Sequence, residues 1–150
     1  MRLRRVRVYH SMCVVANRYL VVAGGDDYLR STEWLDTHDK RKSQTWRGLP
    51  DMVTGRMLHA SCALGTSVYV FCGQSSGRKP TSSIEQLDFS VEGTRAKTRG
   101  WSTIQTDQLR PLYGIGAVRM NSGTIAIFGG EENRRKANSA VYFFDGSTVE

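Results

Sequence analysis

The chain has 150 residues, of which 39% are hydrophobic and 23% are charged, as is normal for a soluble globular protein. No apolar stretch approaches the roughly 18 residues that a membrane-spanning helix needs, and residues 1–8 are too charged for a secretory signal. The 15 glycines and 3 prolines favour an all-β fold with many tight turns. The net charge of +7 favours acidic peptides, nucleic acid or anionic membranes as partners, but it carries no information about the fold.

One pattern recurs three times along the chain. Each copy begins at an arginine (Arg7, Arg56 or Arg110) and continues through an apolar run to a glycine doublet or a variant of one, at 24–25, 72–73 and 129–130. Successive copies begin about 50 residues apart, and a period of this size with four short β-prone runs is typical of a β-propeller blade.

Each copy contains short runs rich in Val, Ile, Tyr, Phe or Cys and bounded by turn residues, which predicts β-strands. First strands are expected at 9–16, 59–64 and 114–120, second strands at 18–23, 67–72 and 124–128, third strands at 32–36, 83–89 and 140–144, and outer strands at 44–47 and 101–104. The third copy shows no outer strand, and residues 2–6 are the candidate to supply it, in the same chain or a neighbour. We also hypothesise that the repeated Arg and Glu residues pair within a blade.

This pattern resembles the kelch repeat over nearly the whole chain. The residues that carry the resemblance are Gly24-Gly25, Gly129-Gly130, Arg7 and His10, Arg56 and His59, and Trp46 and Trp101. The second copy has Cys72-Gly73 in place of the doublet, and in the third copy Tyr113 is aligned where a histidine would stand. The resemblance implies an all-β region of kelch-type propeller blades over 1–150, at about 7–55, 56–109 and 110–150, each antiparallel and four-stranded, with the third incomplete.

Three blades do not close a ring, because propellers contain roughly four to eight. Open sheet faces and unpaired edges would remain. The chain is therefore expected to be a partial propeller with further blades outside it, or half of a six-bladed ring formed by a homodimer.

The resemblance also implies a binding face. The loops after the doublets, at 26–31, 74–82 and 131–139, differ most between copies, and in kelch propellers such loops share one face that commonly grips partner peptides. On this basis the partner-binding residues are Tyr28, Arg30, Arg78, Lys79, Arg134 and Arg135. Because arginine suits bidentate capture of carboxylate or phosphate, the expected partner is an acidic or phosphorylated peptide. The alternative is that these are ordinary solvated loops.

Other reactive residue types favour structural roles. His10 and His59 share one repeat position, and Cys13 and Cys62 share another, which indicates packing rather than catalysis or metal binding. The paired carboxylates at 26–27 and 131–132 are expected to face solvent. The three cysteines (Cys13, Cys62 and Cys72) form no CxxC pair and are expected to be buried free thiols in a reducing compartment, the cytoplasm.

The leading interpretation is a non-catalytic scaffold for protein–protein interaction, with no metal or other cofactor, since no GxGxxG, P-loop, GxSxG or HExxH motif is present. Two alternatives stay open. Some kelch propellers are enzymes, and a sialic acid mutarotase would need only a few polar groups and an arginine for a carboxylate, whereas a copper oxidase site is disfavoured because both aligned histidines belong to the repeat. A basic scaffold in a ribonucleoprotein assembly would explain the net charge, although no RNA-binding signature is present.

Overall fold

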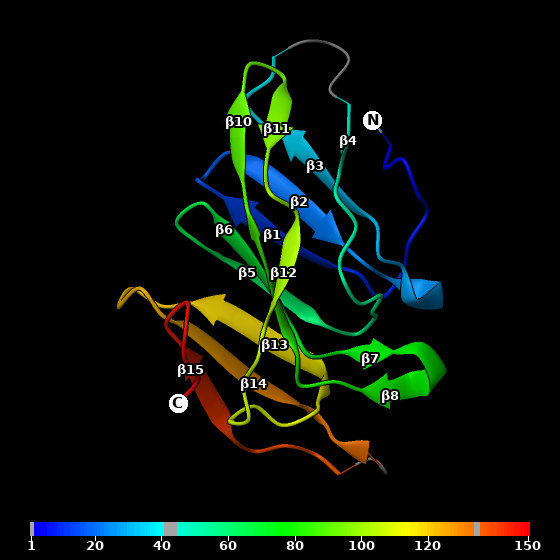
Figure 1. Ribbon diagram of the computed structural model, residues 1–150, viewed down its shortest axis with the longest axis vertical. Helices are drawn as coiled ribbons and strands as arrows, with labels where there is room; N and C mark the ends of the chain where they lie inside the picture. Colours follow the sequence, from blue (N-terminus) through cyan, green and yellow to red (C-terminus); the bar gives the residue numbers. More distant parts are fainter. Residues whose placement is uncertain (1, 41–44, 134–135) are drawn as a thin grey trace.

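The computed structural model describes residues 2–40, 45–133 and 136–150, and it confirms the all-β prediction. Three antiparallel sheets are stacked one against the next, from the first sheet at the top of Figure 1 to the third at the bottom. The described residues form no α-helix, only two short 3-10 helices, η1 (Asp26–Tyr28) and η2 (Ser76–Arg78). None of the sheets closes on itself.

The strands follow one order in each sheet. The first sheet has the order β1 (Ser11–Val15), β2 (Tyr19–Ala23), β3 (Thr32–Asp36) and β4 (Arg47–Leu49). The second has β5 (Ala60–Leu64), β6 (Ser67–Phe71), β9 (Ile84–Asp88) and β12 (Trp101–Ile104), and the third has β13 (Tyr113–Arg119), β14 (Ile125–Glu131) and β15 (Val141–Phe144). Two small ribbons pair β7 (Gln74–Ser75) with β8 (Lys79–Pro80), and β10 (Ser90–Glu92) with β11 (Arg95–Lys97).

The expected strands all form, and their ends differ from the expected ones by a few residues. The outer strand expected at 44–47 begins only at Arg47, and residue 44 lies outside the described residues. In the third sheet, Phe144 forms a bridge with Val149, so the chain itself begins a fourth strand there. Residues 2–6 do not supply this strand within the same chain, because the Arg4 and Arg5 amides instead donate hydrogen bonds to the Glu33 carboxylate in the first sheet. Their pairing with a neighbouring chain stays a prediction.

The core consists of two apolar layers between sheets. The layer between the first and second sheets contains Val15, Val21, Ala23, Trp34, Met52, Ala63, Val68, Val70, Leu87, Phe89 and Trp101. The layer between the second and third sheets contains Cys62, Tyr69, Phe71, Cys72, Ile84, Leu109, Leu112, Ile125, Ile127, Tyr142, Phe144 and Val149. We call these layers the first and second junctions. Each sheet alternates its side chains between two faces, so the second sheet contributes to both junctions.

The strand registers align the three sheets position by position. Equivalent places in the first strands are held by Ser11, Ala60 and Gly116, which face Ala23, Phe71 and Phe128 respectively. The preceding residue is a histidine in the first two sheets and Ile115 in the third. The alignment of Tyr113 with the histidines is therefore wrong by two positions. Leu112, rather than Arg110, holds the repeat arginine's place in the third sheet, and its carbonyl accepts a hydrogen bond from the Gly73 amide just as the Arg56 carbonyl accepts one from Gly25.

A buried ion pair lies in each of the first two sheets, as hypothesised from the sequence. Arg7 Nη2 is 2.5 Å from Glu33 Oε1, and Arg56 Nη2 is 2.5 Å from Glu85 Oε1. All four side chains are at most 4% exposed. Such a pair is stable only when its remaining hydrogen-bonding groups also find partners.

The second pair shows how these groups are satisfied. Arg56 Nη1 donates to the carbonyls of Cys72 (2.7 Å) and Ser83 (3.1 Å), so it holds the doublet against the start of the third strand. The Glu85 carboxylate accepts the amides of Val53 and Thr54, in the linker between the sheets, at 2.7 and 2.9 Å. The pair therefore fixes the doublet, the third strand and the linker to one another.

The third sheet replaces this ion pair with apolar groups. Tyr142 faces Ile127 as Glu85 faces Val70, so it holds the glutamate's place, and Leu112 holds the arginine's. Leu112 is fully buried and Tyr142 is 8% exposed, both within the second junction. Arg110 lies instead at the surface, where it pairs with Glu132 at 2.8 Å.

We expect Glu85→Gln to destabilise the fold by about 3–5 kcal/mol, because it leaves the Arg56 charge buried without its counter-charge. The double variant Arg56→Leu with Glu85→Tyr, which copies the third sheet, should lose less than Glu85→Gln alone. Glu132→Gln is the surface control and should change stability little. Urea unfolding of the four proteins tests this expectation, and a double variant less stable than Glu85→Gln would contradict it.

Candidate partner-binding face

The loops predicted to bind a partner lie at one end of the sheets. In the first two sheets the segment before the first strand pairs with the segment after the second strand, through Val8 and Asp26 and through Met57 and Gln74. In the third sheet the strands themselves reach this end, where Tyr113 of β13 pairs with Glu131 of β14. Figure 1 shows η1, the β7–β8 ribbon and the loop after β14 together on the right-hand side. We call this surface the loop face; its described residues are 26–31, 74–82, 131–133 and 136–139.

Hydrogen bonds between neighbouring sheets hold this face together. The Leu58 amide donates to the Tyr9 carbonyl at 3.0 Å, and the Gly114 amide donates to the Leu58 carbonyl at 2.7 Å. Nearer the tips of the loops, the Arg78 amide donates to the Tyr28 hydroxyl at 3.1 Å. Two residues that were expected to bind a partner are thus brought into contact from different sheets.

Tyr28 and Arg78 also share an unusual backbone conformation. Their φ angles are 53° and 58°, in the left-handed region that side chains other than glycine rarely occupy. Such a conformation costs on the order of 1 kcal/mol or more and persists only where surrounding contacts hold it. The Tyr28 carbonyl packs so closely on Gly55 that a Cβ at position 55 would lie 1.9 Å from it. The backbone of this part of the loop face is therefore set by its neighbours.

The six predicted binding residues differ in their contacts and exposure. Arg30 has a structural role, since its Nε donates to the Met52 carbonyl at 2.7 Å and ties the loop to the linker. Tyr28 supports the β7–β8 ribbon through its hydroxyl. Arg78 and Lys79 are exposed at the end of that ribbon, and neither forms an ion pair with any described residue. The remaining two, Arg134 and Arg135, lie outside the described residues.

Three of the carboxylates on or beside this face have partners within the chain, whereas Asp27 is exposed. Asp26 Oδ1 accepts the Val8 amide at 3.0 Å, and Glu131 Oε2 accepts the Tyr113 hydroxyl at 2.7 Å. The hydrogen bond from Arg110 lowers the pKa of Glu132. The described part of the loop face therefore presents the cations Arg78 and Lys79, which pair with no described carboxylate, together with the exposed carboxylate of Asp27.

His59, Cys62 and Cys72 are buried, whereas His10 and Cys13 are partly buried and His38 is exposed. His59 is 5% exposed, and a Cβ added to Gly24 would lie 2.7 Å from its ring, so the imidazole fills the space that the doublet leaves. Burial lowers the pKa of His59 to about 3, so the ring is neutral at neutral pH. Burial raises the pKa of the Cys13 and Cys72 thiols to about 12, which removes the thiolate needed for nucleophilic chemistry. Cys62 is also a free, buried thiol.

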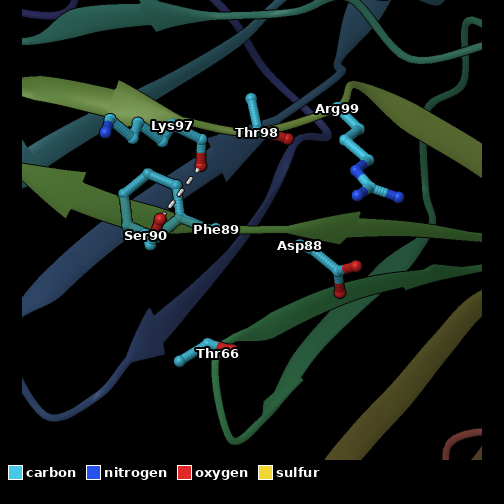
Figure 2. Close-up of a pocket in the computed structure, with 7 residues that line it drawn as sticks. All are labelled: Thr66, Asp88, Phe89, Ser90, Lys97, Thr98 and Arg99. Carbon is cyan, nitrogen blue, oxygen red and sulfur yellow. Dashed lines mark hydrogen bonds between the residues drawn. The ribbon is translucent and has the colours of Figure 1, made fainter.

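A pocket of about 610 Å³ lies at the opposite end of the second sheet (Figure 2). It is lined by Thr66, Asp88, Phe89, Ser90, Lys97, Thr98 and Arg99. Figure 2 shows the Lys97 side chain extending to the left and the Arg99 side chain extending downwards, and Lys97 is paired with Glu92 outside the pocket. The two cations therefore do not converge on a single anion. The β10–β11 ribbon beside this pocket was not predicted, because its strands are rich in Glu, Arg, Ala and Lys, which carry a weak β signal. Gly93 at its turn is the hairpin signal that the sequence offers.

Comparison with known proteins assigns no family, since no family model matches the chain and a search of curated proteins found no match. Within the described residues, none of the helices has the length and apolar character required to pass through a membrane. Among those same residues, no group of three or more His, Cys, Asp or Glu side chains is arranged to hold a metal ion.

The lowered pKa of His59 predicts a pH-dependent stability. The unfolded chain binds a proton near pH 6.5 and the folded chain only near pH 3, so this residue's contribution is complete above about pH 6.5 and is lost as the pH falls towards 3. The loss should approach about 1.4 kcal/mol per pH unit inside that window. We expect His59→Ile, which copies Ile115 of the third sheet, to flatten the stability profile between pH 6 and 4, as measured by urea unfolding. Parallel profiles for the two proteins would contradict this account.

Proposed function

We propose that the three sheets are kelch-type propeller blades and that the protein is a non-catalytic interaction scaffold. The loop face binds an acidic or phosphorylated peptide segment of a protein partner. Support for the blades comes from the repeated doublet, the repeated Arg–Glu pair in the first two sheets and the common register of all three. Backbone hydrogen bonds near the loop face also connect each sheet to the next.

The observation that carries the binding proposal is the pair of uncommitted cations at Arg78 and Lys79. They are adjacent, exposed and mounted on the β7–β8 ribbon, whose backbone Tyr28 holds in place. A cation held this way loses less conformational freedom on binding than one on an unsupported loop. Arginine forms bidentate hydrogen bonds with carboxylate or phosphate, and lysine adds a point charge.

A non-catalytic role agrees with the state of the reactive groups. General acid–base catalysis requires a titratable group near the operating pH within reach of a substrate. His59 is neutral and buried, and the thiols of the partly buried Cys13 and the buried Cys72 are protonated. At the pocket in Figure 2, Asp88 accepts hydrogen bonds from Ser67 and Gln86, which lower its pKa, so this carboxylate is poorly suited to donate a proton.

The test uses an array of acidic and phosphorylated peptides with uncharged counterparts, probed with the purified protein. We expect binding to the charged peptides and at least a tenfold loss of affinity in the double variant Arg78→Ala with Lys79→Ala, because charge-assisted hydrogen bonds each contribute about 1.5–3 kcal/mol. The matched control is Lys97→Ala with Arg99→Ala, which removes the same charge at the opposite end of the second sheet.

The control variant distinguishes a binding site on the loop face from a general attraction of the peptides to the net positive charge. Loss of affinity in the loop-face variant alone supports the proposal. An equal loss in both variants would show that the net charge, and no particular face, attracts the peptides. Absence of binding to every charged peptide would remove the proposal.

A further inference from the structure

Each sheet in the chain has two distinct faces. The forward face points towards the next sheet. On the first sheet it carries Val21 and Trp34, which pack in the first junction. The rear face points towards the preceding sheet. On the second sheet it carries Val70 and Leu87, which pack in the same junction. The second junction repeats this arrangement, with Tyr69 on the forward side and Ile127 on the rear side. One type of interface, forward against rear, therefore occurs twice.

The forward face of the third sheet has no sheet in front of it. Its outward side chains are apolar and well exposed: Val118 48%, Met120 41%, Phe128 44%, Val141 53% and Phe143 45%. The register makes Phe128 equivalent to Phe71 and Ala23, which are 0% and 2% exposed in the two junctions. The position that is buried in both junctions is therefore exposed to solvent in the third sheet. A contiguous apolar face of this kind marks an interaction surface.

The rear face of the first sheet is open along its first strand, whereas Val22 and Leu35, farther across the same face, are only 1% and 5% exposed. Met12 and Val14 are 51% and 53% exposed, whereas Ala63, the equivalent of Val14, is 8% exposed. The outer-strand tryptophan shows the same relation. In the second sheet, Trp101 is buried against the first sheet and donates from its indole nitrogen to the Pro50 carbonyl at 3.0 Å. Trp46 holds the equivalent place beside β4 and is only partly buried.

We propose that two copies of the chain associate head to tail, with the forward face of each third sheet packed on the rear face of the other copy's first sheet. The chain already makes this forward-to-rear interface twice, so each free end carries one half of a known contact. A two-fold arrangement uses both free ends of both copies in two identical junctions, and head-to-tail contacts that close in this way give a ring rather than a filament. This assembly does not depend on the proposed peptide binding.

The solution mass of the intact chain, measured by light scattering behind a sizing column, tests the assembly first. The expected value is twice 16.8 kDa. We expect Phe143→Glu on the forward face and Val14→Glu on the rear face each to give a monomer, because either change puts an unpaired charge into both junctions of the ring. Both positions are about half exposed, so the fold of the single chain should survive, which circular dichroism verifies.

Mixing the two monomeric variants gives the sharper result. The Phe143→Glu chain keeps an unaltered rear face, and the Val14→Glu chain keeps an unaltered forward face. In a mixed pair these two faces can form one junction without an introduced charge, so a dimer should reappear. The matched control is Val53→Glu, which adds the same charge at a 52% exposed position in the linker between the first two sheets and should leave the dimer unchanged.

Three outcomes would overturn the proposal. A monomeric wild-type chain at micromolar concentration would show that its free faces do not bind each other. A dimer that persists in Val14→Glu but not in Phe143→Glu would indicate two forward faces packed together. Failure of the two variants to dimerise on mixing would exclude the head-to-tail contact. Peptide binding is measured separately, so its loss or retention does not alter any of these outcomes.

Discussion

The buried pair of Arg56 and Glu85 is the interaction on which the geometry of the second sheet depends, and Arg7 with Glu33 repeats it in the first. Its guanidinium spans the doublet and the start of the third strand, and its carboxylate anchors the linker from the preceding sheet. A salt bridge in such a place contributes little net stability, but removal of one partner leaves a buried charge. Because all these segments end near the loop face, the pair also positions the loops that we propose to bind a partner.

The third sheet forms without such a buried ion pair among its described residues. Leu112 and Tyr142 take the two places, and Ile115 replaces the histidine, so the second junction is apolar where the first contains charge. An apolar replacement of similar volume can equal or exceed a buried ion pair in stability. It lacks directional hydrogen bonds to the doublet and the linker, however, and in this sheet Arg110 and Glu132 pair at the surface instead.

The sequence predicts most of the strands, because their signals are local: apolar runs that end at Gly or Asn turns. It also predicts the pairing of Arg7 with Glu33, since repetition makes the two positions visible. The alignment of Tyr113 failed because the segment leading into the third sheet is longer by two positions than the arginine spacing implies. The role of Arg30 and the contact between Tyr28 and Arg78 could not be predicted, because both depend on how the linker and the neighbouring sheets pack.

The distribution of tryptophan has a practical consequence for following this protein in solution. Trp34 and Trp101 both lie in the first junction, where Trp34 packs edge-on against Tyr19 and Phe89, and Trp46 borders the first sheet. The third sheet contains no tryptophan, and the aromatic cluster of the second junction consists of Tyr69, Phe71 and Phe144. Intrinsic fluorescence excited at the red edge of indole absorption therefore reports on one half of the molecule and is silent on the other. Separation of the third sheet from the second would pass unseen in such an experiment, and would require tyrosine absorbance or amide exchange to detect.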